Sequence, residues 1–364
     1  MATTKREYGK ITGKETLGLF AVVLMMPIMQ VLRLLRKPFV EWDRVRSWRR
    51  VKAEGGFGYA VSVMNAYQLQ FVDGSSQKVY EKWAPTEGVK VDVEKIGDSG
   101  AQLLWATPRG RKRVIVYFHG GGYVLPTPPF TLSFWNRVTK ALNEKGKDVG
   151  LAFLEYSLVP KETYPVPMKQ TIAMIKHLIS AGTKPEDIFL VGDSAGAALI
   201  LQVVSQILHP IPDIPSVDFQ SSKLGAIILI SPFVTFDNNS PSWAENGRKD
   251  IFPPSFFTHL SGLVKPDIPE SQTAYAEAVK APEGWFKDVD ILVSRAFITA
   301  GANECLRDDI TKFAEAFKEV HSNASFTVIP RGTHNEPYGT FVANEPDKGE
   351  WPPRITEWLA EGML

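Results

Sequence analysis

Short, continuous apolar runs alternate with longer amphipathic segments over much of the chain. The run Val114-Ile115-Val116-Tyr117-Phe118 is apolar at every position, which is typical of a strand buried on both faces. Further strands are predicted at residues 149–155, 188–191, 224–230, 296–300 and 326–329, with helices at 128–144 and 165–181. Because strands and helices alternate, the pattern predicts a mostly parallel sheet with helices on both faces.

The region before this alternation has a different pattern. Residues 36–85 are predicted to be helical and amphipathic, with Trp42, Val45 and Trp48 on one face and arginines on the other. Residues 89–105 contain two short strand-like runs separated by a Gly-Asp-Ser-Gly turn, which predicts a strand pair.

A long insertion follows the predicted strand at Leu224–Ile230. It has no strand pattern and is rich in Pro, Phe and Trp. Long insertions of this kind are commonly lids or functional loops. We therefore expect a lid at about residues 235–290, with Phe252–Val264 as a helical part that lines a substrate pocket.

The first 50 residues hold eleven basic and four acidic side chains, which gives a local net charge of +7. Basic residues lie on both sides of an apolar run from Leu17 to Leu35. Nineteen helical residues span about 28 Å, close to the hydrocarbon thickness of a bilayer. Three interpretations fit this run: a single-pass or interfacial membrane anchor, a lid helix folded back over the active site, or a signal peptide. No small-x-small cleavage site follows the run, which argues against the signal peptide.

Composition narrows the classes of function. The 364 residues carry a net charge of only +1, so the chain as a whole has no polyanion-binding signature, and we expect no nucleic-acid partner. Cys305 is the single cysteine, which excludes an intrachain disulfide and a thiolate metal cluster. We expect neither a metal nor another cofactor.

The segment Gly192-Asp193-Ser194-Ala195-Gly196 lies between a predicted strand and a predicted helix. Gly-x-Ser-x-Gly in this setting is typical of a nucleophile elbow, a strained turn that lifts the serine hydroxyl clear of the sheet. Side chains at Gly192 and Gly196 would clash in so tight a turn. Ser194 is therefore the candidate nucleophile.

A second glycine motif, His119-Gly120-Gly121-Gly122, directly follows the strand ending at Phe118. Glycines let backbone N–H groups turn toward a ligand. The N–H groups of Gly121, Gly122 and Ala195 are the candidate oxyanion hole, with His119, Gly120, Gly192, Asp193 and Gly196 as supporting motif residues.

A nucleophilic serine needs a base and an acid that orients the base. His334 is the candidate base because it lies in the loop after the last predicted strand. The acid is expected between Ser194 and His334 in the sequence. Glu304 is preferred, and Asp308 is the alternative, although an acid at a helix start also has a capping role.

These motifs resemble the hormone-sensitive-lipase family of α/β-hydrolases. The resemblance rests on His119-Gly-Gly-Gly, on Gly192-Asp-Ser-Ala-Gly, and on Tyr156-Ser-Leu-Val-Pro followed by Tyr164-Pro-Val-Pro. It covers roughly residues 80–340 and is nearest to the steryl acetyl hydrolase, arylacetamide deacetylase and fungal carboxylesterase branch. In that family the acid is usually an aspartate two residues before a leucine, which corresponds here to Glu304 before Leu306. The chain departs from the family in having Glu there and one extra residue after Gly301.

The resemblance implies an α/β-hydrolase fold at residues 86–364, with residues 1–85 forming an apolar helix and lid helices. It implies a serine esterase or deacetylase with a Ser194–His334–Glu304 triad. The lid aromatics Phe252, Phe256, Phe257 and Trp243 favour a hydrophobic small-molecule ester. Alternatives are a tailoring, acyl-transfer or cyclisation enzyme of a secondary-metabolite pathway, and a non-catalytic binding protein. Membrane association through Leu17–Leu35 and a cytoplasmic location both stay open, as does the oligomeric state.

Overall fold

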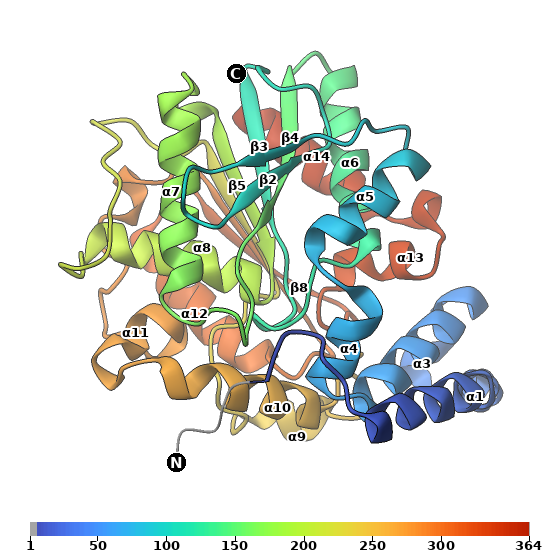
Figure 1. Cartoon of the computed structure of the whole chain (residues 1–364). Coiled ribbons are helices and arrows are strands. Elements are labelled where there is room, and N and C mark those ends of the chain that lie inside the picture. Colours follow the sequence, from blue (N-terminus) through green and yellow to red (C-terminus); the bar gives the residue numbers. More distant parts are fainter. Residues whose placement is uncertain (1–5, 364) are drawn as a thin grey trace.

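A computed structural model describes residues 6–363 of the chain and contains one eight-stranded sheet flanked by helices (Figure 1). The strands are β1 (Val93–Lys95), β2 (Gln102–Trp105), β3 (Arg113–Phe118), β4 (Val149–Glu155), β5 (Ile188–Asp193), β6 (Ala226–Ile230), β7 (Ala296–Gly301) and β8 (Ala324–Ile329). Their order in the sheet is β1-β2-β4-β3-β5-β6-β7-β8. The pairs β1–β2 and β2–β4 are antiparallel and all the others are parallel, which confirms the predicted mostly parallel sheet.

Helices cover both faces of the sheet. They are α1 (Gly13–Arg36), α2 (Glu41–Arg44), α3 (Trp48–Val63), α4 (Ala66–Asp73), α5 (Ser76–Thr86), α6 (Pro129–Glu144), α7 (Val166–Ser180), α8 (Ala195–Leu208), α9 (Pro241–Asn246), α10 (Pro254–Val264), α11 (Thr273–Ala276), α12 (Arg307–Val320), α13 (Gly339–Val342) and α14 (Trp351–Gly362). Short 3-10 turns lie at Lys37–Phe39, Pro185–Asp187, Lys265–Asp267, Glu270–Gln272, Ala278–Lys280, Val289–Ile291, Glu336–Tyr338 and Pro346–Lys348.

Two apolar cores form because the central strands alternate their side chains between the two faces. One core joins the sheet to α7, α8 and α12, and the other joins it to α5, α6 and α14. Every residue of β3, β5 and β6 is buried. This rigid centre holds the carboxyl ends of β3, β5, β6 and β7, where the candidate residues lie.

The expected insertion after β6 is folded into α9, α10, α11 and short 3-10 turns. Phe252–Val264 was predicted to be helical, and α10 covers most of it, beginning at Pro254. Pro253 and Pro254 start the helix because a proline at the first helical position loses no intrahelical hydrogen bond.

The N-terminal helices α1 and α3 pack side by side at the edge of the molecule (Figure 1). Residues 36–85 are helical, as expected, but their polarity is distributed in an unusual way. Val45 and Trp48 are exposed, whereas Asp43 and Arg46 are buried. Helix α1 is long and apolar enough to cross a membrane, and little of it is buried.

Candidate active site

Ser194 forms the turn between β5 and α8, with φ 50° and ψ −119°. This backbone conformation is rare for a residue with a side chain and is typical of functional sites. The Ser194 N–H donates to the Ile230 carbonyl of the neighbouring strand at 2.9 Å. A side chain at Gly196 would collide with the carbonyl of Phe118, so the elbow and the end of β3 fit together only with glycine there.

The glycine-rich loop after β3 lies beside this elbow. Gly121 and Gly122 have φ angles of +94° and +62°, and both line the same pocket as Ser194. Helix α8 begins at Ala195, whose N–H belongs to the first turn, where donors have no partner within the helix. The loop and the helix start thus provide candidate backbone donors close to Ser194.

His119, which begins the glycine motif, has a structural environment. Its ring stacks on Tyr156 at a centroid distance of 4.5 Å and lies 3.2 Å from the Ser76 hydroxyl. Burial lowers the pKa of His119 to about 4, so the ring is neutral at physiological pH. It anchors the loop and does not line the pocket.

The structure brings Glu304 and His334 together. The His334 Nδ1 atom lies 3.1 Å from Glu304 Oε1, and both side chains are buried. Glu304 Oε2 accepts hydrogen bonds from the Ser231 hydroxyl at 2.7 Å and from the Gly301 N–H at 2.5 Å. Both carboxylate oxygens are therefore partnered, and the free edge of the imidazole is directed away from the acid.

The electrostatic surroundings of His334 favour its protonated form. Burial alone would lower the pKa of His334, but the hydrogen bond and charge of Glu304, together with the charges of Asp250 and Asp193, raise it above the ordinary value. An imidazole in this setting accepts a proton readily and holds the resulting charge.

Asp308, the alternative acid, does not contact His334. Its carboxylate accepts from the Ser242 N–H at 2.9 Å and pairs with Arg307 in the first turn of α12. The geometry thus favours Glu304 as the partner of His334, while Asp308 lies in the first turn of α12, where an acid suits the helix dipole.

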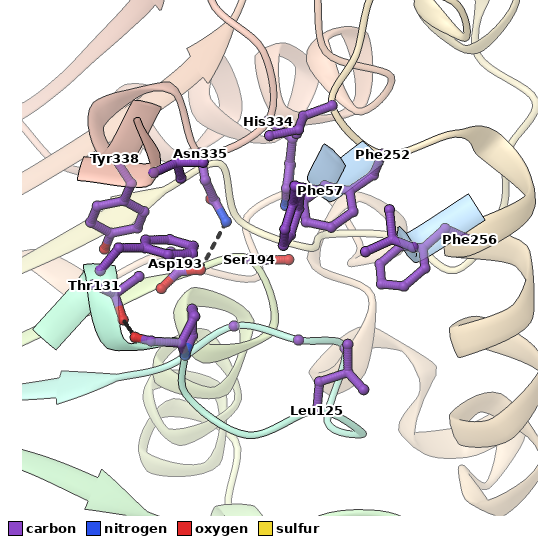
Figure 2. Close-up of a pocket in the computed structure, with 18 of the residues that line it drawn as sticks. Phe57, Leu125, Thr131, Asp193, Ser194, Phe252, Phe256, His334, Asn335 and Tyr338 are labelled. Carbon is purple, nitrogen blue, oxygen red and sulfur yellow. Dashed lines mark hydrogen bonds between the residues drawn. The ribbon is translucent and has the colours of Figure 1, made fainter. Parts of the chain in front are cut away.

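Ser194 and His334 line one pocket of about 1000 Å³, part of it open to solvent (Figure 2). In Figure 2 the His334 ring lies above Ser194, and Phe57, Phe252 and Phe256 stand beside them. Most of the wall is apolar; its aromatic members are Phe57, Phe130, Phe233, Phe252, Phe256, Phe257 and Tyr338. The lid aromatic Trp243 does not line the pocket; its ring packs on Phe257 and its N–H donates to Asp309.

The supporting motif residue Asp193 has polar partners near the site that were not identified from the sequence. Asp193 accepts from the Tyr117 hydroxyl at 2.6 Å and from the Asn335 amide at 2.9 Å, and burial raises the pKa of Asp193 to about 6. Ser231 directly follows β6, and a polar residue at the carboxyl end of a buried strand was a signal that could have found it. Tyr117 lies within an apolar strand run, so its hydrogen bond to Asp193 could not be predicted from the sequence.

Residues 115–337 match a protein-family model described as the α/β-hydrolase fold. This match covers more than half of the chain, and the strand order and elbow agree with it. The chain belongs to this α/β-hydrolase family.

Among curated proteins, the chain is 27% identical over 188 residues to the carboxylesterase/phospholipase LipF of Mycobacterium tuberculosis, covering 50% of this chain and 46% of LipF. It is 28% identical to arylacetamide deacetylase of Oryctolagus cuniculus over 192 residues, 50% of this chain and 46% of that protein. The chain thus spans about half the length of these curated relatives. An acetyl-hydrolase of Streptomyces hygroscopicus is 23% identical over 67% of this chain and 74% of its own length.

The fold is also similar to solved structures. An esterase from the bacterial hormone-sensitive lipase family has a TM-score of 0.65 at 19% identity, covering 88% of this chain and all of that one. Carboxyl esterase 2 from the fungus Tuber melanosporum has a TM-score of 0.59 at 21% identity, covering 76% and 86%. At these identities the likeness establishes the fold.

Proposed function

We propose that this protein is a serine carboxylic-ester hydrolase, an esterase or deacetylase, that uses a Ser194–His334–Glu304 triad. The observation that carries the proposal is the 3.1 Å contact of Glu304 with His334, which lines the same pocket as the strained Ser194. The names of the relatives, which include carboxylesterases and deacetylases, support the same class of reaction.

In the proposed reaction, His334 takes the proton of the Ser194 hydroxyl as the serine oxygen attacks the ester carbonyl. The negative charge of the tetrahedral intermediate is stabilised by the N–H groups of Gly121, Gly122 and Ala195. His334 then gives its proton to the leaving alcohol. Water, activated by the same imidazole, releases the acid from Ser194. Glu304 holds the imidazole in the correct tautomer and stabilises its positive charge throughout.

The pocket lining supports a hydrophobic substrate, such as an acetylated sterol or another lipid-like ester. Phe252 and Phe257 place ring edges on His334, at centroid distances of 5.6 and 5.3 Å. They come from the insertion after β6, while Phe57 comes from α3. We propose that residues 1–85 and residues 235–290 together form the lid over the hydrolase domain.

We also propose that α1 associates with a membrane. Its apolar side chains Leu17, Phe20, Leu24 and Leu35 are exposed, and basic residues flank them. An apolar helix with a basic surround partitions to an anionic lipid surface. Fractionation of the full-length protein against one that lacks residues 1–36 tests this: only the full-length form should sediment with membranes.

The central experiment compares the parent with Ser194→Ala on p-nitrophenyl esters of increasing chain length and on acetylated sterols. The parent should hydrolyse them and be labelled by a fluorophosphonate, and the variant should do neither. Turnover by Ser194→Ala would disprove the mechanism. A folded parent that takes no label and has no turnover would favour a binding function instead.

A further inference from the structure

Asp250 is a buried carboxylate in the insertion after β6, and it takes no part in the mechanism proposed above. It is 8% exposed and does not line the pocket, although its neighbours Ile251 and Phe252 do. It lies between two loops that are distant in the sequence: the acid loop, residues 301–306, and the histidine loop, residues 331–335.

The carboxylate of Asp250 joins these two loops through their backbones. Oδ1 accepts a hydrogen bond from the His334 N–H at 2.9 Å, and Oδ2 accepts one from the Cys305 N–H at 2.8 Å. Oδ1 also accepts from the N–H of Ile251 at 2.7 Å, which fixes the orientation of the carboxylate. One donor thus belongs to the base itself, and the other to the residue that follows the acid.

The same insertion holds the acid loop at further points. The Asn246 amide donates to the Glu304 carbonyl at 3.0 Å, and the Ser242 hydroxyl donates to the Cys305 carbonyl at 2.6 Å. Asp250 differs from these residues because it alone among the three contacts both loops. The 3.1 Å contact between Glu304 and His334 depends on the relative position of these two loops.

We propose that Asp250 is a positioning residue of the triad: its carboxylate holds the His334 backbone at a fixed distance from the Glu304 loop and adds negative charge beside the imidazole. This inference rests on the proposed function. An ionised carboxylate suits the role because it accepts from several N–H groups at once, and such charge-assisted bonds are short and directional.

Three titratable groups face Asp250 from the packed loops: the Glu304 carboxylate and the Cys305 thiol from one, and the His334 imidazole from the other. Burial raises the pKa of Asp250 to about 6, and the positive charge of a protonated His334 opposes that rise. The charge of Asp250 in turn contributes to the raised pKa of His334. Removing the charge should therefore make the imidazole less basic.

The test replaces Asp250 with Asn and with Ala and measures kcat, KM and the pH profile of ester hydrolysis. Asp237→Asn is the matched control, because Asp237 is a carboxylate of the same insertion that pairs with Lys265 and Lys280 on the surface. We expect Asp250→Asn to lose roughly 10- to 100-fold in kcat with little change in KM, since small misplacements of a reacting group have effects of this order. Asp250→Ala should lose more, because it keeps no acceptor oxygen.

The acid limb of kcat/KM should also move to lower pH in Asp250→Asn, by about half a unit to one unit. A purely structural role would change the amount of folded enzyme but would leave this limb in place. Parent-like kcat and an unmoved limb in a folded Asp250→Asn variant would overturn the proposal. If Ser194→Ala kept its activity, the proposed function would fail instead, whatever Asp250→Asn did.

If neither variant folds, Asp250→Glu is the third variant, because it keeps an acceptor carboxylate and displaces its oxygens by one methylene group. We expect this variant to fold, to keep the acid limb near its parent position and to lose kcat, since the distance between the two loops changes. Parent-like kcat in folded Asp250→Glu would overturn the proposal.

Discussion

The central sheet and the N-terminal helices differ in the side chains that they bury and expose. In the sheet, Ile115, Val191 and Ile228 are completely buried. In the N-terminal helices, Glu54, Asp43 and Arg46 are buried, and all but three of the large apolar side chains that are exposed in residues 6–363 lie between Leu17 and Val72. The sheet thus buries apolar side chains almost throughout, whereas α1 to α3 also bury paired charges and leave much apolar surface exposed.

The paired charges form one cluster around Glu54. Arg46 and Arg50 lie 2.7 and 2.6 Å from its carboxylate, and Arg33 of α1 reaches it at 3.7 Å. Arg50 also forms an ion pair at 2.7 Å with Glu336, which lies two residues after His334 in the sequence. The cluster therefore attaches the apolar helix α1 to the loop that carries the candidate base.

The exposed apolar surface of α1 is the feature on which the proposed membrane association rests. Apolar surface is stabilising when it leaves water, at about 25 cal/mol per Å². The sheet obtains this stabilisation by folding, whereas α1 obtains it only when something apolar covers it. A lipid surface is the cover that the basic surroundings of α1 favour.

The largest effect, a loss of kcat, is expected from replacing Glu304, the candidate acid that follows β7. Glu304→Gln should lower kcat roughly 10³- to 10⁴-fold, because the amide cannot stabilise the imidazolium and favours the wrong tautomer. Asp308→Asn is the control and should keep most of the activity. Ester hydrolysis under saturating substrate measures both. Equal losses in the two variants would contradict the assignment of Glu304.

The charge cluster should dominate the stability of the N-terminal helices. Glu54→Gln leaves three arginines without their common partner, and breaking a buried ion pair from one side costs about 3–5 kcal/mol. Urea unfolding followed by tryptophan fluorescence measures the loss. Glu41→Gln, on the exposed surface of α2, should change stability by less than about 0.5 kcal/mol. If Glu54→Gln were as mild as Glu41→Gln, the cluster would not hold these helices.

The two regions also differ in how much the sequence predicts. Apolar runs were enough for the sheet, because a central parallel strand is buried on both faces and is hydrophobic throughout. The elbow and the glycine loop were found because they need glycine at fixed spacing. Chain position after the last strands drew attention to His334 and Glu304, whose assigned roles stay proposals.

Contacts between distant segments were not predictable in this way. Asp250 lies in a stretch with no motif, and its two partners are backbone N–H groups, which have no sequence signature. Arg46 is one of the arginines that the sequence pattern assigns to the polar face of an amphipathic helix, and no pattern pairs it with Glu54. Only the packing of α3 against α1 and the histidine loop brings them out of water.

A substitution on the apolar surface of α1 should have a smaller effect, which falls on membrane binding and not on folding. Val23→Gln should weaken binding to anionic phospholipid vesicles roughly 10- to 100-fold, since burying one such side chain contributes about 1.5–3 kcal/mol. Folding stability should not change, because Val23 is 67% exposed. Val328→Gln makes the same substitution at an exposed position of β8 and should bind vesicles like the parent. Co-sedimentation measures both, and equal binding by both variants would argue against a lipid partner for α1.

The smallest effect concerns pH. Only the neutral imidazole of His334 can act as the base, and its pKa is raised, so kcat/KM should fall as the pH decreases through a value above about 6.5. The charges that raise this pKa come from Glu304, Asp250 and Asp193, none of which belongs to the N-terminal helices. Deletion of residues 1–36 should therefore remove membrane binding and leave the acid limb where it is. If the acid limb of kcat/KM shifted in the deletion variant, the charges around Glu54 would have to act on the pKa of His334. The two regions would then be electrostatically coupled.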